Sequence, residues 1–212
     1  RAVARVPGIC DVSMTTNATM LAPMADELAG AGLKRVNISL DSLKPGTYAR
    51  LTRRGDLASA VAGIHAAQRA GLRPIRLNAV VLRCINSDEI ESLAALTLKH
   101  DWDVRFIEFM PFWGNGGLFG EDYVMPIDEI RRRVLALGVE DRTAQRAAAG
   151  PTDVCATGAE AAVADGQNRS GPANYLRLHG GLGRVGFISR DGDEFCSACN
   201  RIRLTADGMF RP

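Results

Sequence analysis

The fold is decided by three stretches of sequence: RVNISL at 35–40, LASAVAGIHAAQRAG at 57–71 and IRLNAVVL at 75–82. In the first, Val36, Ile38 and Leu40 alternate with polar residues, which predicts a strand with one polar face. In the second, apolar residues recur at helical spacing until Gly71 ends the pattern. The third is rich in β-branched residues and follows a proline. This order predicts two parallel strands joined by a helix.

The same alternation continues on both sides of this unit. Upstream, the sequence predicts a strand over 11–16 and a helix over 19–30. Downstream, it predicts a helix from about Asp88, capped by Asn86 or Ser87, and a strand over 104–110. A further helix begins at Pro126, with Ile127, Ile130, Val134 and Leu137 on one face.

Four strands and three intervening helices across 11–110 predict a parallel α/β sheet. An open, doubly wound sheet and part of a barrel both fit this order. Strands covered by helices on both faces are nearly continuous hydrophobic runs, whereas barrel strands can direct polar side chains into a central site. The polar faces of these strands therefore favour the partial barrel.

Composition excludes several classes of protein. The chain has 212 residues, is 46% hydrophobic and carries a net charge of +2, which is too mild for a nucleic-acid or membrane surface. Its longest apolar runs, such as 79–82, are too short to span a bilayer. Five cysteines, an odd number and mostly isolated, do not predict a disulfide framework. We expect a cytoplasmic protein.

The chain divides into three parts. We expect residues 1–140 to form the partial barrel. Residues 141–173 are rich in Ala, Gly and small polar residues, which predicts a flexible loop or insertion. Short strands return near 175–178 and 184–189, so 174–212 is expected to form a separate C-terminal segment.

This last segment carries the sharpest chemical feature, Cys196-Ser-Ala-Cys199. Two thiolates at this spacing can hold one metal ion or cluster. A redox dithiol would stand where a strand enters a helix, but a strand-like stretch follows here, which weakens the redox interpretation. A metal or cluster site, and two free or zinc-binding cysteines without a catalytic role, remain the alternatives. Arg201 and Arg203 lie two positions apart, so both guanidinium groups share one face of that strand and suit phosphate or purine edges.

Polar residues also mark the ends of the predicted strands, where barrel active sites collect. Thr15 lies at the end of the first strand, and Ser39 and Asp41 at the end of the second. In the interior, Arg76 and Asn78 share a face of the third strand. We expect the counter-charge of Arg76 to be Glu108, which shares a face of the fourth strand with Met110, or a bound anion. The three histidines show no ligand spacing and are interpreted as structural.

The strings SMTTN, RVNISLDSL, RLNAVVLRCIN, RFIEFMPF, GRVGFIS and FCSACNRIRLTADGMFRP resemble the GTP 3′,8-cyclases, in order and spacing, from about Asp11 to Pro212. The resemblance implies an α/β fold, a partial (βα)6 barrel of the radical S-adenosylmethionine (SAM) type, with its strands 3–6 in this chain and a C-terminal cluster-binding extension. It also implies a SAM site at Ser39 and Met110. It further implies ligands of a 4Fe–4S cluster at Cys196 and Cys199, and GTP contacts at Thr15, Arg76, Arg201, Ile202 and Arg203. Arg76 stands where the family commonly has lysine.

The reaction implied is the first step of molybdenum cofactor biosynthesis, the cyclisation of GTP to (8S)-3′,8-cyclo-7,8-dihydroguanosine 5′-triphosphate by a lyase. The family uses SAM, two 4Fe–4S clusters and an electron donor, and a cyclic pyranopterin monophosphate synthase acts downstream. A homodimer is a further expectation. Another two-cluster radical SAM enzyme and a zinc-stapled, non-enzymatic binding module remain alternatives.

Some family motifs lie outside these 212 residues. They are the CxxxCxxC loop, the glycine-rich segment after the second strand, the Gly-Gly tail and the third cysteine of the C-terminal cluster, expected directly after Pro212. We therefore expect these 212 residues alone to be inactive.

Overall fold

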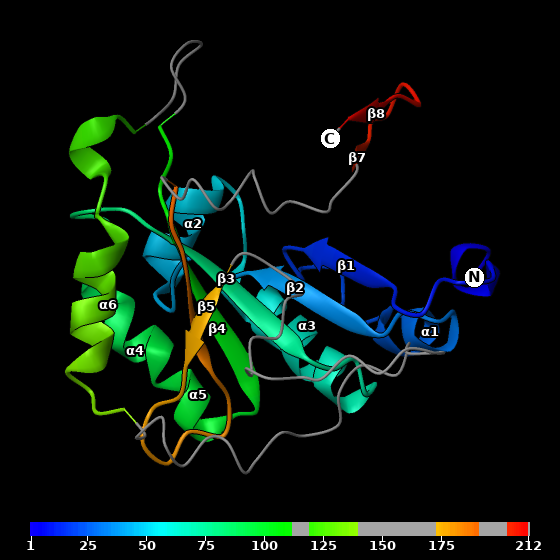
Figure 1. Ribbon diagram of the computed structural model, residues 1–212, viewed down its shortest axis with the longest axis horizontal. Coiled ribbons are helices and arrows are strands. Elements are labelled where there is room, and N and C mark those ends of the chain that lie inside the picture. Colours follow the sequence, from blue (N-terminus) through cyan, green and yellow to red (C-terminus); the bar gives the residue numbers. More distant parts are fainter. Residues whose placement is uncertain (112–118, 140–172, 191–202, 212) are drawn as a thin grey trace, which may run out of the picture.

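The computed structural model describes residues 1–111, 119–139, 173–190 and 203–211 (Figure 1). The strands are β1 (Ser13–Thr16), β2 (Arg35–Ser39), β3 (Ile75–Val81), β4 (Trp102–Glu108), β5 (Asn174–Leu176), β6 (Val185–Ile188), β7 (Arg203–Leu204) and β8 (Phe210–Arg211). The α-helices are α1 (Ala25–Gly30), α2 (Pro45–Thr52), α3 (Leu57–Arg69), α4 (Ile90–Ala94), α5 (Leu96–Lys99) and α6 (Ile127–Leu135). Short 3₁₀ turns are η1 (Val3–Arg5), η2 (Ser87–Glu89) and η3 (Glu121–Tyr123).

Six strands form one sheet in the order β1-β2-β3-β4-β6-β5. Strands β1 to β4 and β6 are parallel, and β5 pairs with β6 in the antiparallel sense. The predicted parallel α/β sheet is therefore confirmed. A separate hairpin pairs β7 with β8. Because β6 pairs with β4, the sheet includes residues beyond 174. The division of the chain into three parts stays a prediction.

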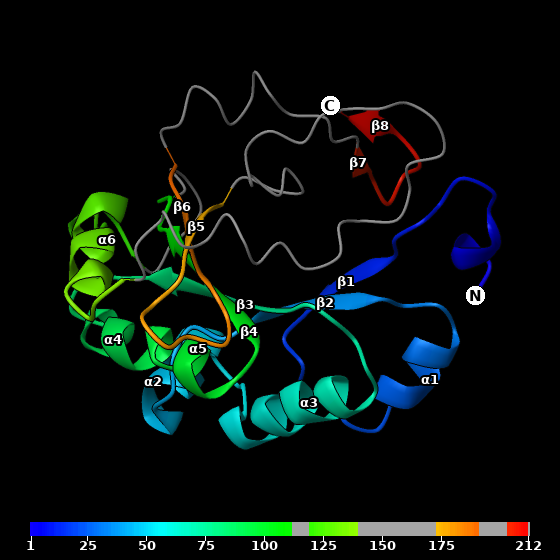
Figure 2. The same ribbon diagram turned by 60° about the horizontal axis from the view of Figure 1, so that its bottom comes forward.

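The strand order distinguishes the two predicted architectures. An open doubly wound sheet reverses its strand order and carries helices on both faces. Here the first four strands are adjacent in chain order, and right-handed crossovers then place all connecting helices on one side. Figure 2 shows α1 to α5 on the same side of the sheet, and α6 packs against α4, β4 and β6. This is the arrangement of a partial barrel, with an outer face under the helices and an inner face opposite.

The outer face forms the hydrophobic core. Alternate residues of each central strand point into the helix layer and are at most 2% exposed: Val36, Ile38, Ile75, Leu77, Ala79, Val81, Val104 and Phe106. Helix α3 covers this face after a regular start, because the Asp56 carboxylate accepts hydrogen bonds from the backbone N–H groups of Ala58 and Ser59. Gly63 lies so close to the loop after β1 that a Cβ would approach the Ala18 carbonyl oxygen to 2.2 Å.

Several local predictions need correction. Helix α1 begins at Ala25 rather than residue 19, because residues 18–24 form turns. Helix α2 was not predicted at all. Asn86 precedes η2 but its side chain does not cap it. The predicted insertion at 141–173 lies almost entirely outside the described residues. Within the described ranges, no helix combines the length and apolar character needed to cross a membrane.

Candidate functional site

The inner face of the sheet carries a row of polar residues at one level. Strand register places Thr15 beside Asn37, Asn37 beside Arg76, and Arg76 beside Asp103. These four residues come from four consecutive strands. Each neighbours the next because parallel pairing puts paired residues on the same face. The polar face predicted from alternation is thus continuous from β1 to β4.

Arg76 is buried in this row, with only 5% of its surface exposed. Its Nε lies 3.8 Å from Asp103 Oδ2 and makes no hydrogen bond. Burial lowers the pKa of Arg76, and the nearby cations Arg35 and Arg105 lower it further. A buried guanidinium with an unpartnered N–H is costly unless a ligand completes its hydrogen bonds.

Asp103 is held mainly by a different arginine. Arg184 donates from Nε to Oδ1 at 3.0 Å and from Nη2 to Oδ2 at 2.7 Å, so the pair is bidentate. The guanidinium carbon of Arg184 lies 4.5 Å from the ring centroid of Tyr175 on β5. Because Arg184 bonds to both oxygens of Asp103, that carboxylate compensates the positive charge of Arg76 only in part.

The next level of the inner face contains Ser39, Asn78 and Arg105 side by side. Arg105 donates from Nε to Asn78 Oδ1 and from Nη2 to Asn37 Oδ1, both at 2.8 Å. Arg105 uses only the side-chain oxygens, so the amide N–H groups of both asparagines can donate to a ligand. Together with Arg76 and Arg184, Arg105 makes the face positive, which favours an anionic ligand.

The ends of β1, β2 and β4 present the predicted ligand residues. Thr15 is exposed, Ser39 is half-buried, and neither hydroxyl makes a hydrogen bond within the described part of the chain. Met110 follows β4 and is 54% exposed. All three are accessible at the carboxyl edge of the sheet, where a parallel barrel binds its ligands. The two hydroxyls can bind polar groups of a ligand, and Met110 offers an apolar surface.

Of the two predicted counter-charges of Arg76, Glu108 was wrong, and a bound anion stays a prediction. Register pairs Glu108 with Val81, so its side chain lies on the opposite face from Arg76. There Glu108 Oε2 accepts hydrogen bonds from Ser189 Oγ and the backbone N–H of Arg190, both at 3.1 Å. Asp103, one residue before the predicted start of the fourth strand, is the carboxylate that faces Arg76.

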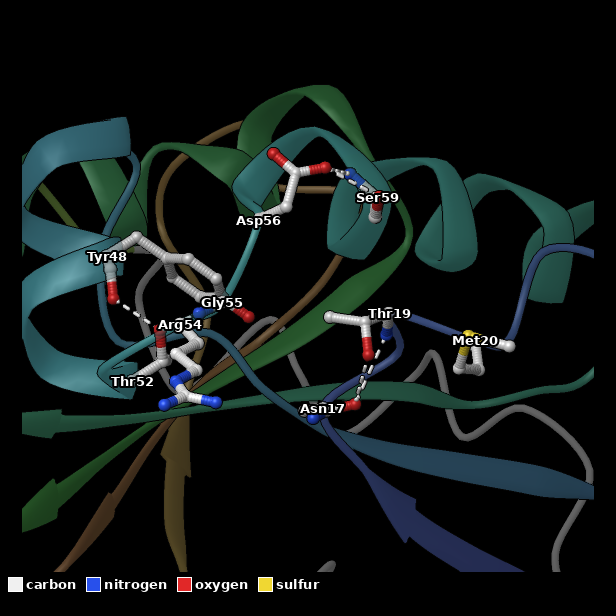
Figure 3. A pocket seen from close by; sticks show the side chains of 9 residues that line it. All are labelled: Asn17, Thr19, Met20, Tyr48, Thr52, Arg54, Gly55, Asp56 and Ser59. Carbon is white, nitrogen blue, oxygen red and sulfur yellow. Dashed lines mark hydrogen bonds between the residues drawn. The ribbon is translucent and has the colours of Figure 1, made fainter.

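A hollow of about 370 Å³ lies beside this site, between the end of β1 and the α2–α3 connection (Figure 3). Most of the residues that line it have polar side chains, among them Asn17, Thr19, Arg54 and Asp56. The buried Tyr48 hydroxyl also lines it and has no hydrogen-bond partner. None of the predicted ligand residues borders this hollow.

Part of the predicted site lies outside the described residues. This applies to Cys196, Cys199, Arg201 and Ile202, while Arg203 is described only as backbone in β7. Cys84 is an exposed free thiol and Cys10 is disulfide-bonded, which the sequence did not predict. No cluster of three or more metal-binding side chains occurs in the described segments.

Some site residues were missed from sequence. Asn37 was seen only as part of a polar face, and Asp103, Arg105 and Arg184 were not proposed. Alternation within Trp102–Glu108 could have suggested Arg105, since Asp103, Arg105 and Ile107 are alternate residues and lie on the same face of the strand. Nothing local connects Arg184 to Asp103, because they are 81 residues apart in the chain.

Comparison with known families agrees with this geometry. Residues 1–97 match the model of the Radical SAM superfamily, and residues 152–212 match that of Molybdenum Cofactor Synthesis C. The first match covers β1 to β3, which carry most of the polar row.

Full-length similarity points the same way. The chain is 44% identical over 212 residues to a protein of Gloeobacter violaceus named GTP 3′,8-cyclase. Proteins of the same name from Moorella thermoacetica and Petrotoga mobilis are 43% and 40% identical. The alignments cover 98–100% of this chain but only 57–58% of these relatives. The resemblance stated from the sequence is confirmed.

Proposed function

We propose that the intact protein is a GTP 3′,8-cyclase. The premise is that this chain joins a radical SAM region to a Molybdenum Cofactor Synthesis C region and is similar throughout to proteins of that name. It would convert GTP to (8S)-3′,8-cyclo-7,8-dihydroguanosine 5′-triphosphate in molybdenum cofactor biosynthesis. The chain spans 58% of the length of its relatives, so the activity belongs to the intact protein.

The observation that carries this proposal is the buried Arg76 in the polar row of the inner face, whose Nε has no hydrogen-bond partner. A triphosphate would supply the acceptors that Arg76 lacks and the negative charge that the three inner-face arginines favour. Thr15 lies in the same row and can bind the nucleotide through its hydroxyl. We assign Arg76 and Thr15, with Arg201, Ile202 and Arg203, to GTP.

SAM, reduced by an iron–sulfur cluster, supplies the radical chemistry when bound. The protein's own contribution is to orient both ligands and exclude water, because a radical reacts with whatever lies nearest. We assign Ser39 and Met110 to SAM, where they would hold it at the carboxyl edge of the sheet. Cys196 and Cys199 are assigned to a second 4Fe–4S cluster near GTP.

The proposal extends to the protein's partners. An electron donor must reduce the cluster, and a cyclic pyranopterin monophosphate synthase would consume the product. We also propose a cytoplasmic location and a homodimer. A zinc-stapled binding module is disfavoured, because the radical SAM match covers β1 to β3, which carry most of the polar row.

Anaerobic turnover of the intact protein tests this proposal. The reconstituted protein, with SAM, GTP and a chemical reductant, should form 5′-deoxyadenosine and the cyclised nucleotide in equal amounts, detected by mass spectrometry. SAM cleavage without consumption of GTP would instead indicate another radical SAM enzyme. A colourless protein containing zinc would contradict the assignment altogether.

A further inference from the structure

The loop that follows β2, residues 40–44, is fixed by buried polar groups from the segment before α4. Glu89 is only 2% exposed, and Ser42 is completely buried. Ser42 Oγ donates to Glu89 Oε1 and the backbone N–H of Leu43 donates to Oε2, each at 2.7 Å. One buried carboxylate therefore holds two consecutive residues of the loop.

Asn86 holds the same loop from the other side. It is completely buried, and its Nδ2 donates to the carbonyl oxygens of Asp41 at 2.6 Å and Val80 at 2.9 Å. Its Oδ1 accepts from the backbone N–H of Leu82 at 2.7 Å. Both N–H donors and the carbonyl of Asn86 are thus used to join the end of β2 to the end of β3.

Asp41 adds a third link between these strand ends. Its Oδ1 accepts from the backbone N–H of Val80 at 2.8 Å, and the backbone N–H of Leu40 donates to the Asn78 carbonyl at 2.8 Å. Burial raises the pKa of the Asp41 carboxyl. The chain is therefore held at every residue from 40 to 43, immediately after Ser39.

Stability alone does not explain this network. A buried, hydrogen-bonded carboxyl group and a buried amide contribute little net free energy relative to apolar groups of the same shape, although breaking the network is destabilising. What such a network provides is a single geometry, because each group has only one satisfied arrangement. That geometry fixes where Ser39 stands relative to Asn78.

We propose that Asn86 and Glu89 are positioning residues that place Ser39 to bind SAM. This inference rests on the proposed function, in which Ser39 contacts SAM. Neither residue reaches the inner face, so each acts through the loop. Small displacements of a ligand-binding group weaken binding strongly. The hydrogen bonds that join this network to β3 and its end are made at residues 78, 80 and 82, beyond Arg76, and Thr15 lies on β1, so the GTP-binding residues should be affected less.

Two near-isosteric substitutions test the inference. Glu89→Gln leaves one oxygen for two donors, and Asn86→Asp replaces the donor to Asp41 and Val80 with an acceptor. Asp88→Asn is the matched control, because Asp88 is exposed, lies between them and pairs with Lys44 of the same loop. Amide hydrogen exchange over residues 40–44 should rise in the first two variants only.

Equilibrium binding of SAM and GTP to the anaerobically reconstituted intact protein gives the decisive readout. We expect the Kd for SAM to rise about tenfold in Glu89→Gln and Asn86→Asp. The Kd for GTP should stay within about twofold, and Asp88→Asn should change neither. If one of these two variants does not fold, the Kd for SAM of the other variant tests the inference.

Two results would overturn the inference while leaving the proposed function intact. They are an unchanged Kd for SAM in a folded variant, and an equal loss of affinity for SAM and GTP, which would indicate a general structural role. Failure of the unsubstituted protein to bind SAM would overturn the proposed function itself, and the inference with it.

Discussion

The two faces of the same strands differ in what they contribute. On the outer face, Ile38, Leu77 and Phe106 are almost fully buried against the helices. On the inner face, the residues between them include Asn37, Arg76 and the other members of the polar row. Period-two alternation thus separates a stabilising surface from a binding surface across the thickness of one sheet.

The comparison teaches that burial has opposite consequences on the two faces. Burying apolar side chains stabilises the fold at about 25 cal/mol per Å². Burying Arg76 without a hydrogen-bond partner for Nε opposes folding. A sequence that keeps such a residue in an ordered strand does so because the site requires it.

The largest effect is expected on the outer face. Phe106→Ala removes a fully buried ring and should lower the free energy of unfolding by about 3–5 kcal/mol. Denaturant unfolding followed by tryptophan fluorescence measures this. Phe210→Ala is the control, since Phe210 is 74% exposed and should change stability by less than about 0.5 kcal/mol. Equal effects at both positions would contradict the assignment of the core.

A smaller loss is expected from Asp103→Asn on the inner face. The substitution removes the bidentate partner of Arg184 and the nearest anion to Arg76. Because Arg184 is partly exposed and can be rehydrated, we expect about 2 kcal/mol rather than the full penalty for a broken buried pair. The same unfolding assay applies. A loss as large as that of Phe106→Ala would show that the inner face is also a major source of stability.

Arg76→Met should break the usual rule that buried substitutions destabilise. It replaces a buried cation lacking a full set of partners with an apolar side chain of similar length. We expect the free energy of unfolding to rise by about 1 kcal/mol, measured without nucleotide. A clear destabilisation would mean that Arg76 belongs to the structural network and not to a binding site.

The smallest effect concerns an ion pair between the helices of the outer layer. Arg133 donates to both oxygens of Glu91, and this hydrogen bonding lowers the pKa of the Glu91 carboxyl below 4.5. Its stabilisation is present above the unfolded pKa and is lost as pH falls through the folded value. Both side chains are about a third exposed, so we expect at most about 0.5 kcal/mol. Glu91→Gln should flatten the pH dependence of stability on the acidic side of the ordinary glutamate pKa, and an unchanged profile would contradict the pair.

Much of the fold could be predicted because alternation and helical spacing are local signals. The strands β1 to β4 and the polar face with Arg76 and Asn78 follow directly from them. Helix α2 was missed because its sequence, PGTYARLT, begins with Pro and Gly and has few apolar residues. Tertiary contacts, rather than local propensity, stabilise this helix.

The site could be predicted less completely, because local sequence patterns do not specify the register between strands. Asp103 and Glu108 are both carboxylates of β4, but they are separated by five residues, an odd number, and therefore lie on opposite faces of the sheet. Arg184 reaches Asp103 only because β6 pairs with β4, which local patterns do not specify. The resemblance to known cyclases supplied Ser39, Met110 and Thr15, which alternation alone could not separate from other strand-end residues.

Nucleotide affinity tests the central claim, that the inner face binds GTP, most directly. The Kd for GTP should be measured with the intact protein, its Arg76→Met variant and an Arg83→Met variant. Arg83 is a suitable control because it follows the same strand and pairs with Glu129 of α6 in the helix layer. The account predicts a loss of about tenfold or more for Arg76→Met and no change for Arg83→Met. Equal affinity in all three proteins would contradict it.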